Sequence, residues 1–120
     1  MSDLAGKVPA SVDWCLPQGQ TWDDTILWES DGVPVDLTGW QARMMLRAAA
    51  EDASPTLALS TVSGTMSVTS AGIIALSCSA ASASAVTAGT YVYDLEVVNT
   101  SGAVRRLMQG RALVSREITR

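Results

Sequence analysis

One stretch, residues 31–47, constrains the fold more than any other part of the chain. It begins with Asp31-Gly32, a dipeptide that closes tight turns because glycine adopts positive φ without a steric penalty. A second turn signal, Thr38-Gly39, precedes an alternation of two sets of side chains: Trp40, Ala42, Met44 and Leu46 in one, and Gln41, Arg43, Met45 and Arg47 in the other. A period of two residues is typical of a β-strand with one buried face and one wetter face.

The rest of the chain repeats this pattern of short strand-like runs between turn signals. Strands are expected over residues 11–16, 21–28, 40–47, 56–60, 66–69, 73–78, 90–99 and 104–115. Short strands at such regular spacing are typical of sandwiches and barrels. We therefore predict an all-β, immunoglobulin-like antiparallel β-sandwich of about seven to eight strands.

The two longest runs should form a hairpin around Thr100-Ser101-Gly102. The first places Tyr91, Tyr93, Leu95 and Val97 on one face. The second places Met108, Gly110, Ala112 and Val114 on its inner face and Leu107, Gln109, Arg111 and Leu113 on the other. Small residues at 110 and 112 should lie opposite large neighbours such as Tyr93, which evens out the core volume.

The Ser- and Ala-rich stretch 79–89 allows two interpretations, a linker between two domains or a short helical turn near 79–88. We favour the turn, capped by Ser79 or Ser82 and ended at Gly89, because neither flank can form a core alone. A chain of 120 residues is expected to form one domain. We divide it into a flexible N-terminal arm, 1–10, a sandwich domain, 11–116, and a C-terminal tail, 117–120.

Charge and hydropathy limit the kinds of partner that the protein can bind. Eight basic and twelve acidic residues give a net charge of −4, which argues against nucleic acid as the main partner. Arg105, Arg106 and Arg111 form a small basic cluster, interpreted as a solvated strand face, with contact to an acidic partner as the alternative. No run of about 18 apolar residues predicts a membrane span. The first nine residues lack the features of a signal peptide.

The chain lacks the residues that most enzyme mechanisms need. There is no histidine, which removes Ser-His-Asp and Cys-His catalysis and most zinc sites. Asp23 and Asp24 are adjacent, so on a strand they point to opposite faces. Cys15 and Cys78 are interpreted as two buried thiols, with a disulfide as the alternative. No spacing suits a metal or a cofactor, and we expect no enzymatic activity, no metal and no cofactor.

Four tryptophans stand against zero phenylalanines. Most of them should fill the core, but an exposed aromatic can anchor a protein interface or stack on a sugar. Trp14, next to the N-terminal arm, is the favoured interface candidate. Met45 and Leu113, apolar residues on otherwise polar faces, are further candidates, as are Arg105 and Arg106.

Several segments together resemble a known family: residues 18–22 (QGQTW), 31–44 (DGVPVDLTGWQARM), 88–97 (AGTYVYDLEV) and 109–111 (QGR). They are similar to small structural proteins of tailed bacteriophages, above all to the N-terminal, immunoglobulin-like domain of the baseplate upper protein. The resemblance covers about residues 18–118. It implies a tail or baseplate adaptor that attaches fibre or receptor-binding components, with no catalytic residue.

The resemblance also implies a location and partners. The protein would be a virion component assembled in the host cytoplasm, present in symmetric copies and bound to other virion proteins of the tail, baseplate or fibre. In the family a coiled-coil or fibre segment usually follows this domain, whereas this chain ends at Arg120. A capsid-decorating or neck-associated role is therefore one alternative. A carbohydrate-binding module is another, and it requires exposed aromatic side chains on one face.

Overall fold

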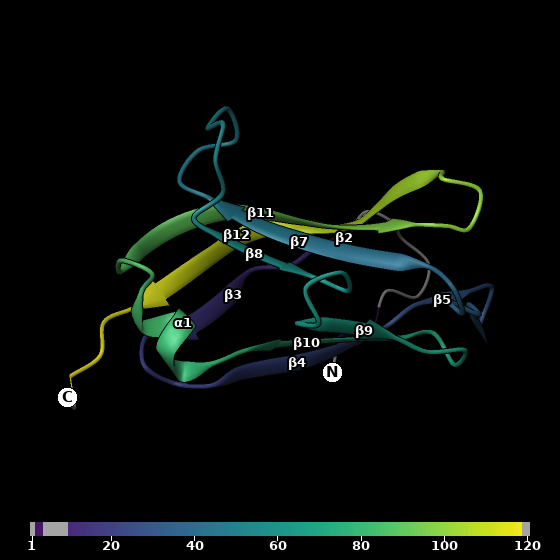
Figure 1. Ribbon diagram of the computed structural model, residues 1–120, viewed down its shortest axis with the longest axis horizontal. Helices are drawn as coiled ribbons and strands as arrows, with labels where there is room; N and C mark the ends of the chain where they lie inside the picture. Colours follow the sequence, from purple (N-terminus) through teal and green to yellow (C-terminus); the bar gives the residue numbers. More distant parts are fainter. Residues whose placement is uncertain (1, 4–9, 119–120) are drawn as a thin grey trace.

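Two β-sheets face each other in the computed structural model, which describes residues 2–3 and 10–118 (Figure 1). The smaller sheet has the order β1 (Ser2–Asp3), β4 (Trp22–Leu27), β10 (Ile73–Cys78), β9 (Met66–Val68). The larger sheet runs from β12 (Val104–Ser115) through β11 (Gly89–Val98) and β7 (Gln41–Arg47) to β8 (Leu57–Ser60). β2 (Ala10–Ser11) and β3 (Trp14–Pro17) pair in parallel with β12, and β5 (Glu29–Ser30) and β6 (Val33–Pro34) form a separate hairpin. The predicted all-β sandwich is confirmed.

The expected alternation is confirmed on the central strands of the larger sheet. On β7, Ala42, Met44 and Leu46 are at most 1% exposed. On β11, Tyr91, Tyr93, Leu95 and Val97 all point into the core. Ile26 of β4 and Ile74 of β10, paired directly across the smaller sheet, close the core from the other side. Burying each large apolar side chain stabilises the fold by about 1.5–3 kcal/mol, so these rows hold the sheets together.

One residue of β12 departs from the expected alternation. Leu107 was expected to face outward, but it is fully buried. The reason is a β-bulge: Met108 pairs with Leu95 and Arg106 pairs with Glu96, so Leu107 is an extra residue with no partner on β11. A bulge lets two consecutive side chains depart from strict alternation. Leu107 and Met108 both enter the core as a result.

The expected fit between Tyr93 and Gly110 is confirmed, because the two are direct cross-strand partners. The Tyr93 hydroxyl donates a hydrogen bond to the Val12 carbonyl at 2.6 Å. A Cβ at position 110 would collide with that same carbonyl. Burial, with a smaller effect of the Asp13 carboxylate, raises the pKa of Tyr93, which keeps the hydroxyl a hydrogen-bond donor.

The Ser/Ala-rich stretch forms the short helix α1 (Ala80–Ser84), so the linker interpretation was wrong. Ser79 is its N-cap, and its hydroxyl accepts a hydrogen bond from the Ser82 amide at 3.1 Å. The helix ends at Ser84, before the expected Gly89, and the chain then turns Val86 into the core. The helix covers one end of the sandwich (Figure 1).

Both cysteines are free thiols, so the disulfide alternative was wrong. Cys78 is buried as expected, and burial raises the pKa of its thiol. Cys15, expected to be buried, is exposed, because it pairs with Leu113 on the outward side of the larger sheet. The longest helix among the described residues, α1, is far too short and polar to cross a bilayer.

Candidate docking face on the larger sheet

The outward side of β7, β11 and β12 carries aligned rows of polar side chains, and we call it the outer face. Strand pairing sets three rows, each written from β7 to β12: Arg43, Glu96 and Arg106, then Met45, Asp94 and Gln109, then Arg47, Val92 and Arg111. A fourth row holds Thr90, Leu113 and Cys15. Alternation turns these residues outward because their neighbours along each strand fill the core.

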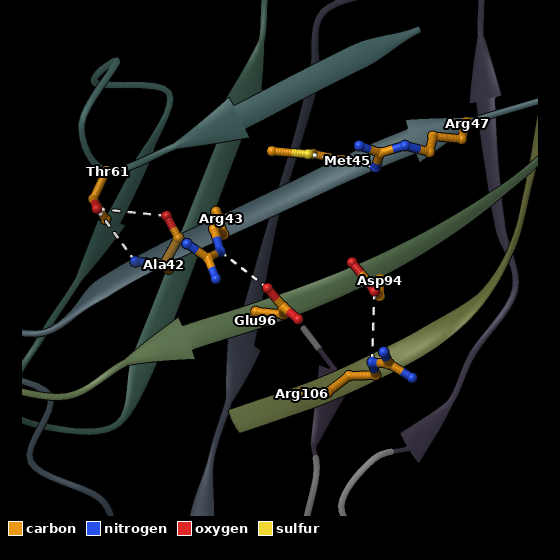
Figure 2. A network of polar contacts seen from close by, with 8 residues as sticks. All are labelled: Ala42, Arg43, Met45, Arg47, Thr61, Asp94, Glu96 and Arg106. Atoms are coloured by element: carbon orange, nitrogen blue, oxygen red, sulfur yellow. Dashed lines mark hydrogen bonds and ion pairs between the residues drawn. The ribbon is translucent and has the colours of Figure 1, made fainter. Parts of the chain in front are cut away.

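Two ion pairs cross the strands of the outer face (Figure 2). Arg43 Nε lies 2.9 Å from Glu96 Oε1, and the two side chains are 44% and 26% exposed. Arg106 Nε lies 3.5 Å from Asp94 Oδ2. Exposed pairs of this kind contribute only about 0–1 kcal/mol to stability. Such side chains can therefore exchange partners when another protein surface approaches.

The third row presents two arginines without a carboxylate partner among the described residues. Arg47 donates from Nε to the Asp52 carbonyl at 2.9 Å and from Nη1 to the Met45 sulfur at 3.5 Å. At Arg111 the backbone amide is held by the Asp13 carboxylate at 3.1 Å, and its side chain is exposed. The two arginines flank Val92 on neighbouring strands, so their backbones are about 10 Å apart.

A shallow hollow with a volume of about 420 Å³ lies in the outer face. Its walls include Met45, Arg47, Val92, Asp94, Arg106 and Gln109. Ala50, from the loop that projects beyond the larger sheet in Figure 1, forms part of the rim. The lining combines apolar side chains with hydrogen-bond donors, and both members of the Asp94–Arg106 ion pair belong to it. That combination suits contact with a protein surface.

Three of the five expected interface residues share the outer face. Met45 and Arg106 line the hollow, and Leu113, 49% exposed, lies two rows beyond Met45. Arg105 does not join them, because the bulge aligns it with the buried Val97 and turns it to the opposite side of the sheet. The expected basic cluster of residues 105, 106 and 111 is therefore split between two faces.

Arg105 instead lies at one end of the sandwich, with its guanidinium 5.8 Å from the centre of the Trp28 ring. It lines a second hollow of about 320 Å³, with Trp28, Val35, Trp40, Asn99 and Val104. Trp28 and Trp40 meet edge to face at 5.7 Å, so both indoles are fixed in place. A cation over an indole contributes about 0.5–1 kcal/mol at such a site.

Trp14 is held by aromatic contacts. Its ring stacks on Tyr93 at 5.0 Å, and Trp22 meets it edge to face at 5.2 Å. None of the four tryptophans is exposed: Trp28 is buried, and the others are partly buried against the core. The carbohydrate-binding alternative needs exposed aromatic rings on one face, and the tryptophans of this chain do not provide them.

The sequence-based candidates omitted Arg43, Arg47, Val92 and Glu96. The alternation of β7 and β11 already placed each of them on an outward face. Their alignment into rows depends on the register between strands that are distant in the sequence, which alternation does not define.

The fold was compared with known proteins. No protein-family model matches the chain, and no curated protein is significantly similar to it. Among solved structures, the chain is similar to the N-terminal domain of ORF48 of phage TP901-1, with a TM-score of 0.57. The two sequences are 11% identical, and the match covers 95% of this chain and 93% of the other. At that identity the likeness concerns the fold: this chain is a β-sandwich module with the architecture of a phage protein domain.

Proposed function

We propose that this protein is a non-enzymatic structural component of a phage virion. It serves as a tail or baseplate adaptor that attaches fibre or receptor-binding components, and the outer face is the surface that docks. The observation that carries the proposal is the match of nearly the whole chain to an N-terminal domain of a phage protein. The sequence resemblance of residues 18–118 to baseplate upper proteins leads to the same expectation.

The outer face has the properties that protein docking needs. Leu113 and Met45 supply apolar anchors, and the arginines around them supply directed hydrogen bonds. Arginine and large apolar side chains carry much of the binding energy in protein interfaces. The weak ion pairs of Arg43 and Arg106 impose little cost when they are rearranged.

The test compares two surface substitutions in particles assembled from the complete chain. Leu113→Asp places a charge in the outer face, whereas Val62→Asp places the same charge at an 80% exposed position in the turn between β8 and β9. We expect both variants to fold, as judged by circular dichroism. Mass spectrometry of purified particles should show incorporation of Val62→Asp at the normal level and a loss of at least about tenfold for Leu113→Asp, the effect of about 1.4 kcal/mol.

Equal incorporation of the two variants would contradict the role of the outer face. A chain found in no purified particle would contradict the virion role itself. If the chain is found in particles, a cryo-EM map would distinguish attachment at the tail or baseplate from decoration of the head.

We also propose that the N-terminal arm contributes to docking. Residues 4–9 lie outside the described residues, while Ser2–Asp3 form β1 and pair with the end of β4. Of the described residues in this segment, Ser2–Asp3 form only a two-residue strand and Ala10 is only partly buried against the core, so we expect the domain to fold without residues 1–10. Incorporation into particles should fall, and normal incorporation of the deletion would restrict docking to the folded domain.

A further inference from the structure

Charge is distributed unevenly along the chain. Residues 10–42 contain six acidic residues and no basic one, and residues 53–93 contain no charged residue at all. Four of the eight basic residues, Arg43, Arg47, Arg106 and Arg111, lie on the outer face, and among the described residues Asp94, Glu96 and Asp13, whose carboxylate accepts from the Arg111 amide, oppose them. The outer face therefore carries a small excess of positive charge, although the whole chain carries a net charge of −4.

Four other acidic residues lie on β4 of the smaller sheet or in the segment that follows it. Asp23 lies on β4 and pairs with the exposed Ser77, so its carboxylate points away from the core. Glu29 and Asp31 belong to the hairpin that directly follows β4, and Asp36 comes after it. We call these four residues the acidic edge. None of them forms an ion pair with a basic residue in the described part of the chain, where the two ion pairs use Asp94 and Glu96.

We propose that the outer face of one copy of this chain binds the acidic edge of a second copy. The inference rests on the proposed docking role of the outer face and names its partner. Arg47 and Arg111, which form no ion pair with a carboxylate of the described residues, supply the positive groups, and Val92 between them supplies apolar contact. Because the two surfaces are different patches of the molecule, the contact is head-to-tail, and repeating it produces a ring or an open chain of copies.

Complementary charge makes the association dependent on salt. Exposed charges interact over about 10 Å at 0.1 M salt and over about 3 Å at 1 M. Sedimentation of the complete chain should show association at about 50 mM NaCl that weakens at least tenfold at about 500 mM NaCl. A chain that remains monomeric at about 1 mM concentration and low salt would overturn the inference.

Two variants separate a head-to-tail contact from a symmetric one. Arg47→Glu/Arg111→Glu reverses the charge of the two arginines that flank Val92 and leaves the acidic edge, whereas Asp23→Asn/Glu29→Gln/Asp31→Asn removes three of the four charges of the acidic edge and leaves the outer face. All five side chains lie outside the buried core, and asparagine tolerates the positive φ of residue 31. Each variant alone should be monomeric. A mixture should form a 1:1 dimer and nothing larger, because each variant retains one complementary surface.

Other outcomes have distinct meanings. Absence of the mixed dimer would overturn the head-to-tail contact. Arg105→Glu, on the opposite side of the sheet, is the matched control and should associate like the unmodified chain. If the chain never self-associates while Leu113→Asp still fails to enter particles, the inference fails and the proposed function stands, with another virion protein as the partner.

Cys15 provides an independent readout in the unmodified chain. Its thiol is exposed on the outer face beside Leu113, whereas the Cys78 thiol is buried and should not react in the folded protein. Modification of Cys15 by a maleimide at constant pH should be slowed at least threefold under associating conditions. High salt or Arg47→Glu/Arg111→Glu should restore the rate, and an unchanged rate during association would place the contact elsewhere on the molecule.

Discussion

Gly110→Ala tests the packing of the β3 side of the sandwich against β12. A Cβ at position 110 would collide with the Val12 carbonyl, which is backbone and also accepts the Tyr93 hydroxyl at 2.6 Å. The Val12 amide is fixed as well, since it donates to the Gln109 carbonyl at 3.0 Å. The collision therefore cannot be relieved by a side-chain rotation, and the segment between β2 and β3 must move.

Two effects determine how much stability Gly110→Ala should lose. Forcing an extra carbon into a packed position costs about 1–3 kcal/mol. Displacing the Val12 carbonyl also weakens its hydrogen bond with Tyr93, and an unsatisfied buried polar group costs about 1–3 kcal/mol more. The sum is about 2–6 kcal/mol. For a chain of this length, thermal unfolding should occur lower by about 4 °C per kcal/mol, or by about 8–24 °C.

Gly89→Ala is the matched control, because Gly89 has the same φ of 156° and no atom lies within 4 Å of the place that an added Cβ would occupy. Any backbone cost of alanine at that φ is common to both variants. The difference between their free energies of unfolding therefore measures the effect of the collision alone. The assay is thermal and urea unfolding followed by circular dichroism. The reasoning is refuted if Gly110→Ala and Gly89→Ala differ by less than about 0.5 kcal/mol, the scatter of ordinary surface substitutions.

Three further predictions concern stability. Leu107→Ala should lower the free energy of unfolding by about 2–5 kcal/mol in urea titrations, because Leu107 is fully buried at the bulge, and a loss below about 0.5 kcal/mol would place it at the surface. Arg43→Ala should change the urea midpoint by the equivalent of at most about 1 kcal/mol, because its ion pair with Glu96 is exposed, and a larger loss would reveal a structural role. The Thr38 hydroxyl and amide lower the pKa of Asp36 below 3.8, so the carboxylate stabilises the fold above that pH and this contribution is lost as pH falls through the lowered value. Asp36→Asn should thus be less stable than the unmodified chain at pH 7 and equally stable in strong acid; an equal difference at both pH values would exclude this titration.

The sequence predicted the strands and their buried faces well where alternation was uninterrupted. On β11, four apolar side chains at every second position identified both the strand and its inner face. The helical turn after β10 was also predictable, because Ser79 is a strong N-cap and the flanking strands complete one core. These features depend on local propensity and periodicity, which a single sequence contains.

Features that depend on distant pairing were not predictable. Residues 11–16 were expected to form one strand, but Val12 and Asp13 leave the ladder between β2 and β3. There the Val12 carbonyl accepts a hydrogen bond from the hydroxyl of Tyr93, a residue 81 positions away. Likewise, neither the parallel pairing of β3 with β12 nor the exposure of Cys15 has a local signal. Such features result from tertiary contacts that override local preference.

The bulge at Leu107 shows how one such feature determines the candidate docking face. If β12 continued the pairing of Met108 with Leu95 without interruption, Leu107 would oppose Glu96 and Arg106 would oppose the buried Val97. Leu107 would then be exposed, and Arg106 would point toward the core. The extra residue reverses both positions. The bulge therefore adds Leu107 to the core and places Arg106, in place of Arg105, on the outer face, where it completes the Arg43–Glu96–Arg106 row.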